Sequence, residues 1–354
     1  MPAFWEEPDF DDHELVEVVR DRASGLTAII AVHSTHLGPA AGGTRFWHYD
    51  DGRGAIRDAL RLSRGMSYKN AMAGLPMGGG KAVIMADAAR TKTPAMLAAF
   101  GDAVQALQGK YVTAEDVGIN EADMVAVSQR TPFVTGLPNP DSDFAGGDPG
   151  PFTALGIFLG IKAAVKHKLG KDSVSGVHVA LQGTGSVGGG VARLLAGEGA
   201  RLTLADVDTA RADALAAELG GTAVAADTIM DTACDVFSPN ALGAIFDDAG
   251  VARVQAPIVA GGANNQLARA EHGPALAARG ILYAPDYVIN AGGIIAVGLE
   301  YLARRSGEPC AIETVHDRIG EIPGRLTQIW QASDADGRSP DQVADAMAQK
   351  LIGR

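Results

Sequence analysis

The sequence predicts an α/β protein with two domains. Its 354 residues suffice for two cores of ordinary size, and 47% of them are apolar. From Val177 onward, apolar strand-like runs alternate with helical segments, a pattern typical of a parallel sheet with crossover helices. Residues 135–150 are dense in Gly, Pro and Asp, which is typical of a linker. We therefore expect a first domain over residues 1–140 and a second over 141–334.

The first domain begins with two β-branched-rich runs separated by a turn, which predicts a hairpin in a small sheet. We expect its strands at 15–19, 26–32, 44–49, 82–85 and 111–113, a loop at 37–43, and helices at 55–66 and 94–107. Asn120 is the expected N-cap of a further helix.

The second domain begins with a helix over residues 151–166, because Pro151 suits a first helical turn. The strands and helices that follow are expected at 177–181, 187–195, 202–205, 209–219, 236–237, 258–259 and 281–282. Beyond Asn290 the chain is expected to be helical, and we expect its C-terminal helix, residues 335–354, to pack back on the first domain.

A glycine-rich segment, residues 64–84, contains two lysines whose neighbours in the sequence are mostly small and uncharged. No other charged residue lies between Lys69 and Lys81. Burying an ammonium among apolar groups is unfavourable unless its pKa falls or an anion pairs with it. Gly78, Gly79 and Gly80 let the backbone approach a ligand, so we expect Lys81 at the start of a strand, facing a cleft. An acid within the interval between Lys69 and Lys81 would pair with Lys81 and raise its pKa, so an interval without charge suits a base.

The second domain contains a G-x-G-x-x-G motif that directly follows an apolar strand and opens a helix. Its first glycine permits a tight turn, the second admits a pyrophosphate and the third allows close helix packing. The helix N-terminus supplies unpaired N–H groups. This context predicts a Rossmann-type doubly wound dinucleotide-binding domain whose cofactor contacts are Gly183, Thr184, Gly185, Ser186, Val187 and Gly188.

Asp206 ends the next apolar strand, at the position expected of a carboxylate that accepts hydrogen bonds from ribose. A carboxylate there repels a 2′-phosphate, which predicts NAD rather than NADP, although the nearby Arg211 would partly offset that repulsion.

The first domain must then hold the substrate and move protons. No tyrosine is followed four residues later by lysine, and no histidine could be given a carboxylate partner, which disfavours short-chain and histidine-dependent hydroxy-acid dehydrogenases. Lys69, Lys81 and Asp116 suit amino-acid oxidation, which needs a cation for the α-carboxylate, a base near neutral pKa and a proton shuttle. A second ammonium nearby would lower the pKa of the base.

Several ordered motifs resemble the Glu/Leu/Phe/Val amino-acid dehydrogenase family, and most closely its leucine, phenylalanine and valine members. The resemblance covers nearly the whole chain. The motifs are Pro39–Arg45, Gly65–Asn70, Gly78–Lys81, Thr113–Gly118, Gly183–Gly188 and Gly262–Gln266.

This resemblance implies NAD-dependent oxidative deamination of an L-amino acid to the 2-oxo acid and ammonia, and the reverse reaction. It implies that Lys69 binds the α-carboxylate, that Lys81 is the general base acting through water, and that Asp116 shuttles protons to and from the amino group. It also implies substrate contacts by Gly42, Gly43 and Asn265, and cofactor contacts by Asn240, Asn264 and Asn290. A homo-oligomer built through the first domain and a cleft between the domains are implied as well.

Glutamate-type members resemble this chain but carry a lysine where Ala41 stands. Without that cation a buried substrate carboxylate would be unfavourable by several kcal/mol, so the side chain of the substrate should be apolar. The resemblance places Ala41, Met66, Ala114, Ile294 and Val297 around that side chain. Branched-chain and aromatic substrates remain open, with branched aliphatic ones preferred.

Composition disfavours other classes of protein. The net charge is −12, without long basic runs, which disfavours nucleic acid as a partner. No apolar run reaches the length of a membrane helix and the N-terminus is acidic, so we expect a cytoplasmic protein. Cys234 and Cys310 are the only cysteines, which supports neither a disulfide framework nor a structural zinc site. The alternatives to an amino-acid dehydrogenase are a catalytically silent NAD-sensing protein and a dehydrogenase of another substrate class.

Overall fold

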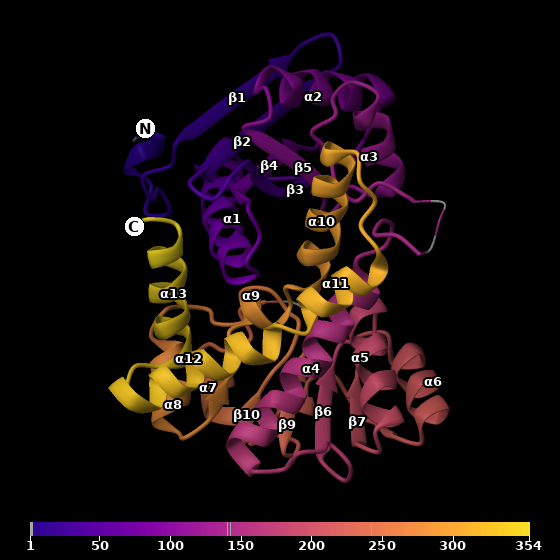
Figure 1. Ribbon diagram of the computed structural model, residues 1–354, viewed down its shortest axis with the longest axis vertical. Helices are drawn as coiled ribbons and strands as arrows, with labels where there is room; N and C mark the ends of the chain where they lie inside the picture. The colour runs from indigo at the N-terminus through magenta and orange to yellow at the C-terminus, as the bar shows by residue number, and fades with distance from the viewer. Residues whose placement is uncertain (1–2, 140, 142, 242) are drawn as a thin grey trace. The chain divides into compact units, whose positions relative to one another are not determined.

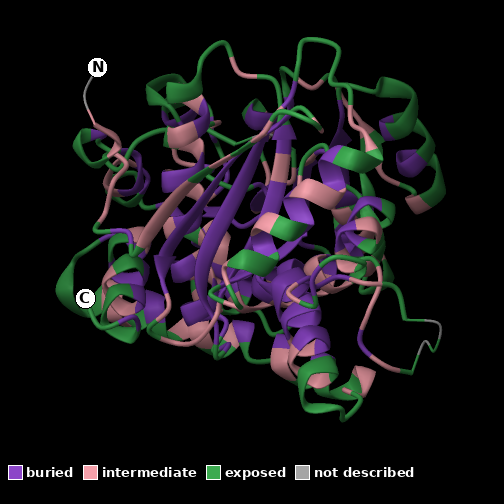
Figure 2. Ribbon diagram, turned by 90° about the horizontal axis from the view of Figure 1, so that it is seen from above, coloured by how far each residue is buried: buried purple, intermediate pink, exposed green. Residues whose placement is uncertain are grey.

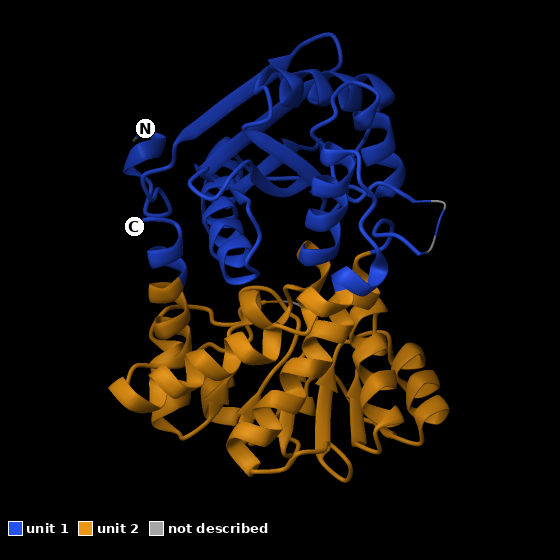
Figure 3. Ribbon diagram, in the orientation of Figure 1, with its two compact units in different colours: residues 1–148, 295–315, 348–354 blue, residues 149–294, 316–347 orange. Residues whose placement is uncertain are grey.

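The computed structural model describes residues 3–139, 141, 143–241 and 243–354 (Figure 1). The chain forms two compact units (Figure 3). The first contains residues 1–148, 295–315 and 348–354, and the second contains 149–294 and 316–347.

The first unit is built on a mixed five-stranded sheet with the order β1-β2-β4-β3-β5. The β1–β2 and β2–β4 pairs are antiparallel, whereas β3 pairs in parallel with both β4 and β5. The strands are β1 (Leu15–Asp21), β2 (Leu26–Ser34), β3 (Ala40–Trp47), β4 (Gly78–Met85) and β5 (Tyr111–Glu115). The predicted hairpin is confirmed as β1 and β2.

Helices cover both faces of this sheet, and its central strands are mostly buried (Figure 2). Helix α1 (Gly52–Met72) packs through Ala55 and Ala59 on Ile29 and Val83. The other face packs against α2 (Pro94–Ala106) and α3 (Glu121–Ser128) through a larger apolar cluster that includes Phe100. Asn120 caps α3 as predicted, with its side chain accepting from the Asp123 N–H. A short 3₁₀ helix, Phe4–Glu6, precedes the sheet.

Two boundaries in the first unit differ from the prediction. Strand β3 begins at Ala40, inside the predicted loop, and the three glycines 78–80 lie within β4, so Lys81 lies in the middle of that strand. These positions require glycine because Ser67 and Tyr111 lie too close to leave room for a side chain. A methyl group on Gly79 would lie 2.0 Å from the Ser67 backbone nitrogen, and one on Gly80 would lie 2.6 Å from the Tyr111 ring. Because glycine has a low strand propensity, the prediction began this strand only after the three glycines.

The second unit is a parallel six-stranded sheet with the order β11-β10-β9-β6-β7-β8. This is the strand order of the doubly wound dinucleotide-binding fold. The predicted two-domain α/β fold with a Rossmann-type second domain is therefore confirmed. The strands are β6 (His178–Gln182), β7 (Arg201–Ala205), β8 (Thr222–Ala223), β9 (Val236–Pro239), β10 (Ile258–Val259) and β11 (Leu282–Tyr283). The two-residue β8 is too short for periodicity to reveal, and the prediction omitted it.

The remaining helices are those of the second unit and of the C-terminal part of the chain. They are α4 (Gly150–Leu169), α5 (Ser186–Gly197), α6 (Thr209–Leu219), the 3₁₀ helix Ile229–Asp231, α7 (Asp248–Arg253), α8 (His272–Ala278), α9 (Asp286–Ile289), α10 (Gly292–Ser306), α11 (Ile312–Ile319), α12 (Ile322–Asp336) and α13 (Pro340–Leu351). Gly337 ends α12 in the left-handed conformation, as expected of a helix-ending glycine.

The compact units differ from the predicted domains in the C-terminal part of the chain. The first boundary falls at residues 148 and 149, within the predicted linker, two of whose residues lie outside the described part. Residues 295–315 group with the first unit although the prediction assigned them to the second. Of the segment expected to pack back on the first domain, only residues 348–354 group with it. Helical periodicity cannot reveal these assignments because it does not say which core a helix joins.

The described residues offer neither a membrane-spanning helix nor a cluster of metal ligands. No helix in that part of the chain is long and apolar enough to span a membrane. Within the same residues, no group of three or more His, Cys, Asp or Glu side chains could hold a metal ion.

Candidate active site

Lys81 lies on the face of the first sheet that α1 covers. Alternate residues of a strand face opposite sides, and Val83, two positions after Lys81, packs on α1. The Lys81 side chain is 6% exposed. An ammonium so deeply buried requires a partner or a lowered pKa.

Asp116 provides that partner. It follows the last residue of β5, and its Oδ2 lies 2.9 Å from Lys81 Nζ. Burial is the largest influence on Lys81 and lowers its pKa below the ordinary value, although the Asp116 charge opposes this. Burial alone would raise the pKa of Asp116, but the Lys81 and Arg45 charges outweigh it and lower that pKa. The pair therefore combines a base that loses its proton unusually easily with a carboxylate that stays ionised.

The structure gives the lowered pKa of Lys81 a different main cause. We expected a neighbouring ammonium in a poorly solvated site to lower it, whereas burial is the largest cause and the Arg45 guanidinium adds to it. No acid lies between Lys69 and Lys81 in the sequence, and the acid that contacts Lys81 is Asp116, which directly follows β5. Sequence spacing gives no information about which side chains neighbouring strands bring together.

Arg45 was quoted only within a motif, and the structure places it beside the pair. Its Nε donates to Asp116 Oδ2 at 3.1 Å and its Nη1 to Asp58 Oδ2 at 2.8 Å. Asp58, on α1, also accepts from the Tyr49 hydroxyl at 2.7 Å and from Arg61 at 3.0 Å. A network of charges thus connects α1 to the Lys81–Asp116 pair.

Ala41, Gly42 and Gly43 lie in β3, next to β4 and β5. Ala41 is buried. A methyl group on Gly42 would lie 1.8 Å from the Gly80 carbonyl oxygen, and one on Gly43 would lie 2.9 Å from the Asp116 Cβ. The strand therefore approaches the pair closely only because both residues are glycine. The Tyr111 hydroxyl donates to the Gly42 carbonyl at 2.6 Å and fixes this backbone.

Met66 and Lys69 lie on α1, three residues apart and therefore on one side of the helix. Both side chains are partly buried. The Met66 Cγ lies 3.1 Å from the position of a methyl group on Gly42, so this side of α1 faces the glycine strand. Asn70 fastens the helix by donating to the Ala41 and Gly78 carbonyls at 3.3 and 2.6 Å.

The other expected substrate contacts divide between the units. Ala114 lies in β5 opposite Gly43 and is nearly buried. Val297, in the first unit, accepts a hydrogen bond from the Thr135 hydroxyl through its carbonyl. Ile294 and Asn265 belong to the second unit, and Asn265 has a φ of 52°.

The nucleotide motif of the second unit has the geometry expected of a phosphate loop. Gly183 has a φ of 87°, which favours glycine. A methyl group on Gly188 would lie 1.9 Å from the Gly183 carbonyl oxygen, whereas one on Gly185 would meet nothing within 4 Å. Helix α5 begins at Ser186 and its N-cap, Gly185, makes no side-chain hydrogen bond. The loop, with Thr184 and Val187, therefore combines the tight turn, an open second glycine and unpaired helix N–H groups.

Asp206 accepts three hydrogen bonds from its own unit. Its Oδ2 accepts from the Thr184 N–H at 2.7 Å and the Thr184 hydroxyl at 3.0 Å, and its Oδ1 accepts from the Asp208 N–H at 2.9 Å. These donors and the Arg211 charge lower the pKa of Asp206 against the effect of burial. The ionised carboxylate therefore fixes the loop as well as standing at the position expected for ribose.

Three asparagines connect the strand ends of the second sheet. Asn240 accepts from the Gly262 N–H at 2.8 Å, and Asn290 donates to the Gly262 carbonyl at 3.1 Å and to the Asn264 side chain at 2.8 Å. The Oδ1 of Asn290 is buried and has no hydrogen-bond partner among the described residues. Such an acceptor suits a donor from a bound cofactor, so the residues present fit a dinucleotide.

Comparisons with known proteins agree with this geometry. Residues 13–132 match the model described as "Glu/Leu/Phe/Val dehydrogenase, dimerisation domain", and residues 208–351 match "Glutamate/Leucine/Phenylalanine/Valine dehydrogenase". The chain is 44% identical to the leucine dehydrogenase of Thermoactinomyces intermedius over 342 residues, which cover 96% of this chain and 91% of that protein. The chain belongs to the Glu/Leu/Phe/Val dehydrogenase family.

Further relatives agree with this assignment. The chain is 42% identical to the valine dehydrogenase of Streptomyces virginiae over 97% of this chain and 95% of that protein. The crystal structure of L-tryptophan dehydrogenase from Nostoc punctiforme superposes with a TM-score of 0.83, at 39% identity over 96% of each chain. The expected family is confirmed, and with it an amino-acid dehydrogenase, an oxidoreductase that acts on CH–NH₂ donors.

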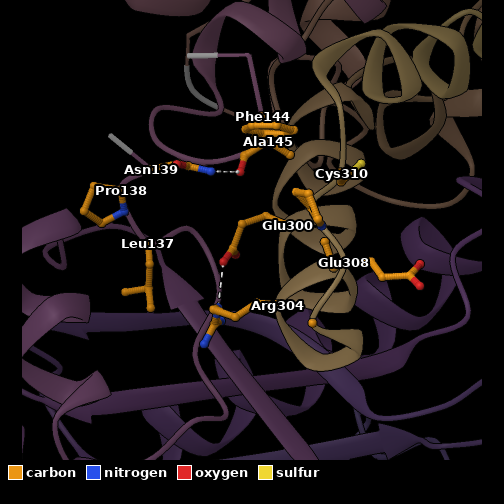
Figure 4. A pocket seen from close by; sticks show the side chains of 12 residues that line it. Leu137, Pro138, Asn139, Phe144, Ala145, Glu300, Arg304, Glu308 and Cys310 are labelled. Atoms are coloured by element: carbon orange, nitrogen blue, oxygen red, sulfur yellow. Dashed lines mark hydrogen bonds and ion pairs between the residues drawn. The ribbon is translucent and has the colours of Figure 1, made fainter. Parts of the chain in front are cut away.

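The first unit of this dehydrogenase contains a cavity of about 440 Å³ whose lining includes none of the predicted site residues (Figure 4). Its lining includes Glu300 and Arg304, which pair at 2.9 Å, and Glu300 also accepts from the Thr135 hydroxyl at 2.9 Å. The Glu300 and Arg304 side chains therefore already have hydrogen-bond partners, which hold α10 in place. We assign the cavity no part in catalysis.

The histidines of the dehydrogenase do have acidic neighbours, contrary to the sequence argument. His33 Nε2 lies 3.1 Å from Asp11 Oδ2, and its Nδ1 lies 2.8 Å from the Ser67 hydroxyl. Burial, reinforced by the Arg354 charge, lowers the pKa of His33 to about 4. A neutral His33 thus anchors the turn of α1 that carries Met66 and Lys69, which is a structural role.

Proposed function

We propose that this dehydrogenase oxidatively deaminates an apolar L-amino acid, preferentially a branched aliphatic one, with NAD as cofactor. The observation that carries the proposal is the contact between a buried Lys81 with a lowered pKa and an ionised Asp116. Acid–base groups matched to the working pH are what amine oxidation and hydrolysis require.

The substrate is held by its charged groups. The Lys69 ammonium binds the α-carboxylate, and Gly42 and Gly43 allow the substrate backbone to approach β3. The face that α1 shares with the sheet supports this, because Met66 and Lys69 lie on the same side of α1 and Met66 faces Gly42. Asn265 contributes from the second unit.

The chemistry proceeds by proton transfers on the substrate. Asp116 first takes a proton from the ammonium group of the substrate, which leaves a neutral amine. When bound, NAD would supply the acceptor for the hydride of the α-carbon, and loss of that hydride leaves the substrate as an iminium. Lys81 then removes a proton from a water molecule as its oxygen attacks that carbon, which gives a carbinolamine. Asp116 returns its proton to the amino nitrogen of the carbinolamine. The C–N bond breaks, ammonia leaves with the electron pair, and Lys81 and Asp116 together take up and return the remaining protons, which yields the 2-oxo acid.

An apolar side chain fits the residues around Ala41. Ala41 is 1% exposed and Ala114 8% exposed, and neither carries a group that could pair with a substrate carboxylate. An unpaired carboxylate buried there would be unfavourable by several kcal/mol. The relatives named leucine and valine dehydrogenase support an aliphatic substrate, whereas the tryptophan dehydrogenase shows that a related chain acts on a larger one.

The preference for NAD rests on Asp206. By its place after the second strand of the nucleotide-binding sheet, the Asp206 carboxylate is expected to meet the ribose, where it would repel the 2′-phosphate of NADP. Arg211 lies 3.7 Å from Asp206 and offsets only part of that charge because it also pairs with Asp208 at 3.0 Å.

The protein is further proposed to be a homo-oligomer that assembles through its first unit, in the cytoplasm. The match of residues 13–132 to a dimerisation domain supports the assembly. Sedimentation analysis of the purified chain tests it, and a monomer at micromolar concentration would contradict it.

The activity is tested with a panel of L-amino acids and NAD, followed by NADH absorbance. We expect the highest kcat/KM for leucine, isoleucine or valine, lower values for phenylalanine and tryptophan, and none for glutamate. One methylene in an apolar pocket changes kcat/KM by about 10- to 200-fold, so these differences are measurable. The reverse reaction should require both ammonia and the matching 2-oxo acid.

Two outcomes would overturn the proposal. NAD binding without oxidation of any amino acid would indicate the catalytically silent alternative. Oxidation of a hydroxy acid or an aldehyde, with no ammonia requirement in reverse, would indicate a dehydrogenase of another substrate class.

A further inference from the structure

The two carboxylate oxygens of Asp116 have different contacts. Lys81 Nζ and Arg45 Nε both contact Oδ2, at 2.9 and 3.1 Å. In the part of the chain that the structure describes, no hydrogen bond or ion pair reaches Oδ1. The Asp116 side chain is 24% exposed, compared with 6% for Lys81. One oxygen is therefore held by two cations and the other is free to meet a substrate group.

Arg45 can hold Asp116 in this way because its own position is fixed. Its guanidinium donates through Nη1 to Asp58 Oδ2 while Nε contacts Asp116, so the two carboxylates hold the guanidinium at two of its donors. Asp58 is itself fixed by Tyr49 and Arg61. A guanidinium has its donors in a rigid plane, so it sets the orientation of a carboxylate more firmly than an ammonium does.

We propose, on the basis of the function proposed above, that Arg45 is a positioning residue: it holds Asp116 Oδ2 and thereby presents Oδ1 to the amino group of the substrate. With Lys81 as its single contact, the Asp116 carboxylate could still rotate about that contact. With Arg45 as the second contact, the carboxylate plane is fixed and Oδ1 remains available for proton transfer. Arg45 touches no reacting atom and acts through Asp116.

Other charged groups near Asp116 do not replace Arg45. Glu115 and Asp58 are both acidic, and the Asp58 charge acts on Lys81 and Arg45. Arg61, on α1, contacts Asp58 Oδ1 at 3.0 Å and reaches the pair only through Asp58. Burial raises the pKa values of Tyr49 and Tyr111 above the ordinary value for tyrosine, so both hydroxyls are neutral. Lys81 and Arg45 are the cations that contact Asp116.

The test compares Arg45→Met and Arg45→Lys with the matched control Arg57→Met, an arginine of α1 that pairs with Asp9 at 3.2 Å, outside this network. For Arg45→Met we expect kcat with the best amino acid of the panel to fall about 10- to 100-fold, within the range of a mispositioned proton-transfer group, while the KM values for amino acid and NAD change less than about threefold. Loss of one cation should also move the acidic limb of the kcat profile to higher pH, because Asp116 would ionise less readily. Arg45→Lys should recover part of kcat, and Arg57→Met should retain it.

Guanidinium chloride at millimolar concentration provides a second measurement. It should raise the kcat of Arg45→Ala by refilling the cation position and leave the kcat of Arg57→Ala unchanged. If Arg45→Met does not fold, Arg45→Lys and Arg45→Gln give the same comparison. An unchanged kcat and pH profile in folded Arg45 variants, with an active wild-type enzyme, would overturn the inference and leave the proposed function intact. A wild-type enzyme inactive on every amino acid would overturn both.

Discussion

Lys81 Nζ and Asp116 Oδ2 lie 2.9 Å apart at the buried face of the first sheet, although they come from different strands and from opposite sides of α2 in the sequence. Neither group would be stable there alone, because burial disfavours both charges. Together they form an acid–base pair whose two pKa values are both lowered. The predictions below follow from this pair and from the residues that surround it.

Changing Lys69 to alanine should weaken substrate binding more than it slows turnover. Removing the ammonium removes the charge-assisted contact to the α-carboxylate, so we expect KM for the amino acid to rise roughly 10- to 100-fold. KM for NAD should stay the same, because the nucleotide motif lies in the other unit. Steady-state kinetics check this, and an unaltered amino-acid KM would remove Lys69 from the carboxylate site.

Adding a methyl group at Gly79 should destabilise the first unit. It would lie 2.0 Å from the Ser67 backbone nitrogen, so α1 would have to move. Overpacking of this kind costs roughly 1–3 kcal/mol of unfolding free energy. Denaturant unfolding should show a lower midpoint for Gly79→Ala. Gly65→Ala is a suitable control, because its added methyl group meets nothing within 4 Å.

Deamination should accelerate with rising pH through the lowered pKa of Lys81. Lys81 must be unprotonated to act as a base, and burial moves its titration below that of an ordinary lysine. The profile of kcat/KM against pH should therefore rise on the alkaline side and reach a plateau below pH 10.5. Lys81→Arg should abolish the rise, since arginine stays charged. A rise that persists in Lys81→Arg would assign it to another group.

The stability of the enzyme should depend on Asp116 at acidic pH. Its pKa in the folded protein lies below that of an ordinary aspartate, so its ionised form stabilises the folded state at neutral pH, and this contribution is lost as the pH falls through the folded pKa. Asp116→Asn should therefore unfold with a weaker dependence on pH below about 4 than the wild type. Urea denaturation at several acidic pH values measures this, and identical slopes would contradict the assigned charge.

The nucleotide half of the fold could be predicted closely from the sequence. An apolar strand, the Gly183–Gly188 loop and Asp206 are local signals, and parallel strands with crossover helices leave few topologies. The structure adds that Asp206 also fixes Thr184, which no spacing argument indicates. The asparagines 240, 264 and 290 come together only because strand ends meet at one edge of the sheet.

The first unit was harder to predict because its site depends on contacts between distant strands. The sequence indicated Lys81 and Asp116 as candidates but not that they touch, and Arg45 was missed as a partner. Glycines 78–80 resembled a loop because glycine is rare within strands, and only the close approach of Ser67 explains them. The C-terminal helices were assigned to the wrong unit in part, since an amphipathic pattern does not identify its partner core.

The central claim is that Lys81 is the base of an amino-acid dehydrogenase, and the kcat of Lys81→Ala with L-leucine and NAD tests it most directly. We expect a loss of about 10²- to 10⁴-fold in kcat, as for removal of a general base, with NAD binding by calorimetry and the unfolding midpoint retained. A folded Lys81→Ala enzyme that binds NAD and reduces it with L-leucine at the wild-type rate would contradict the claim.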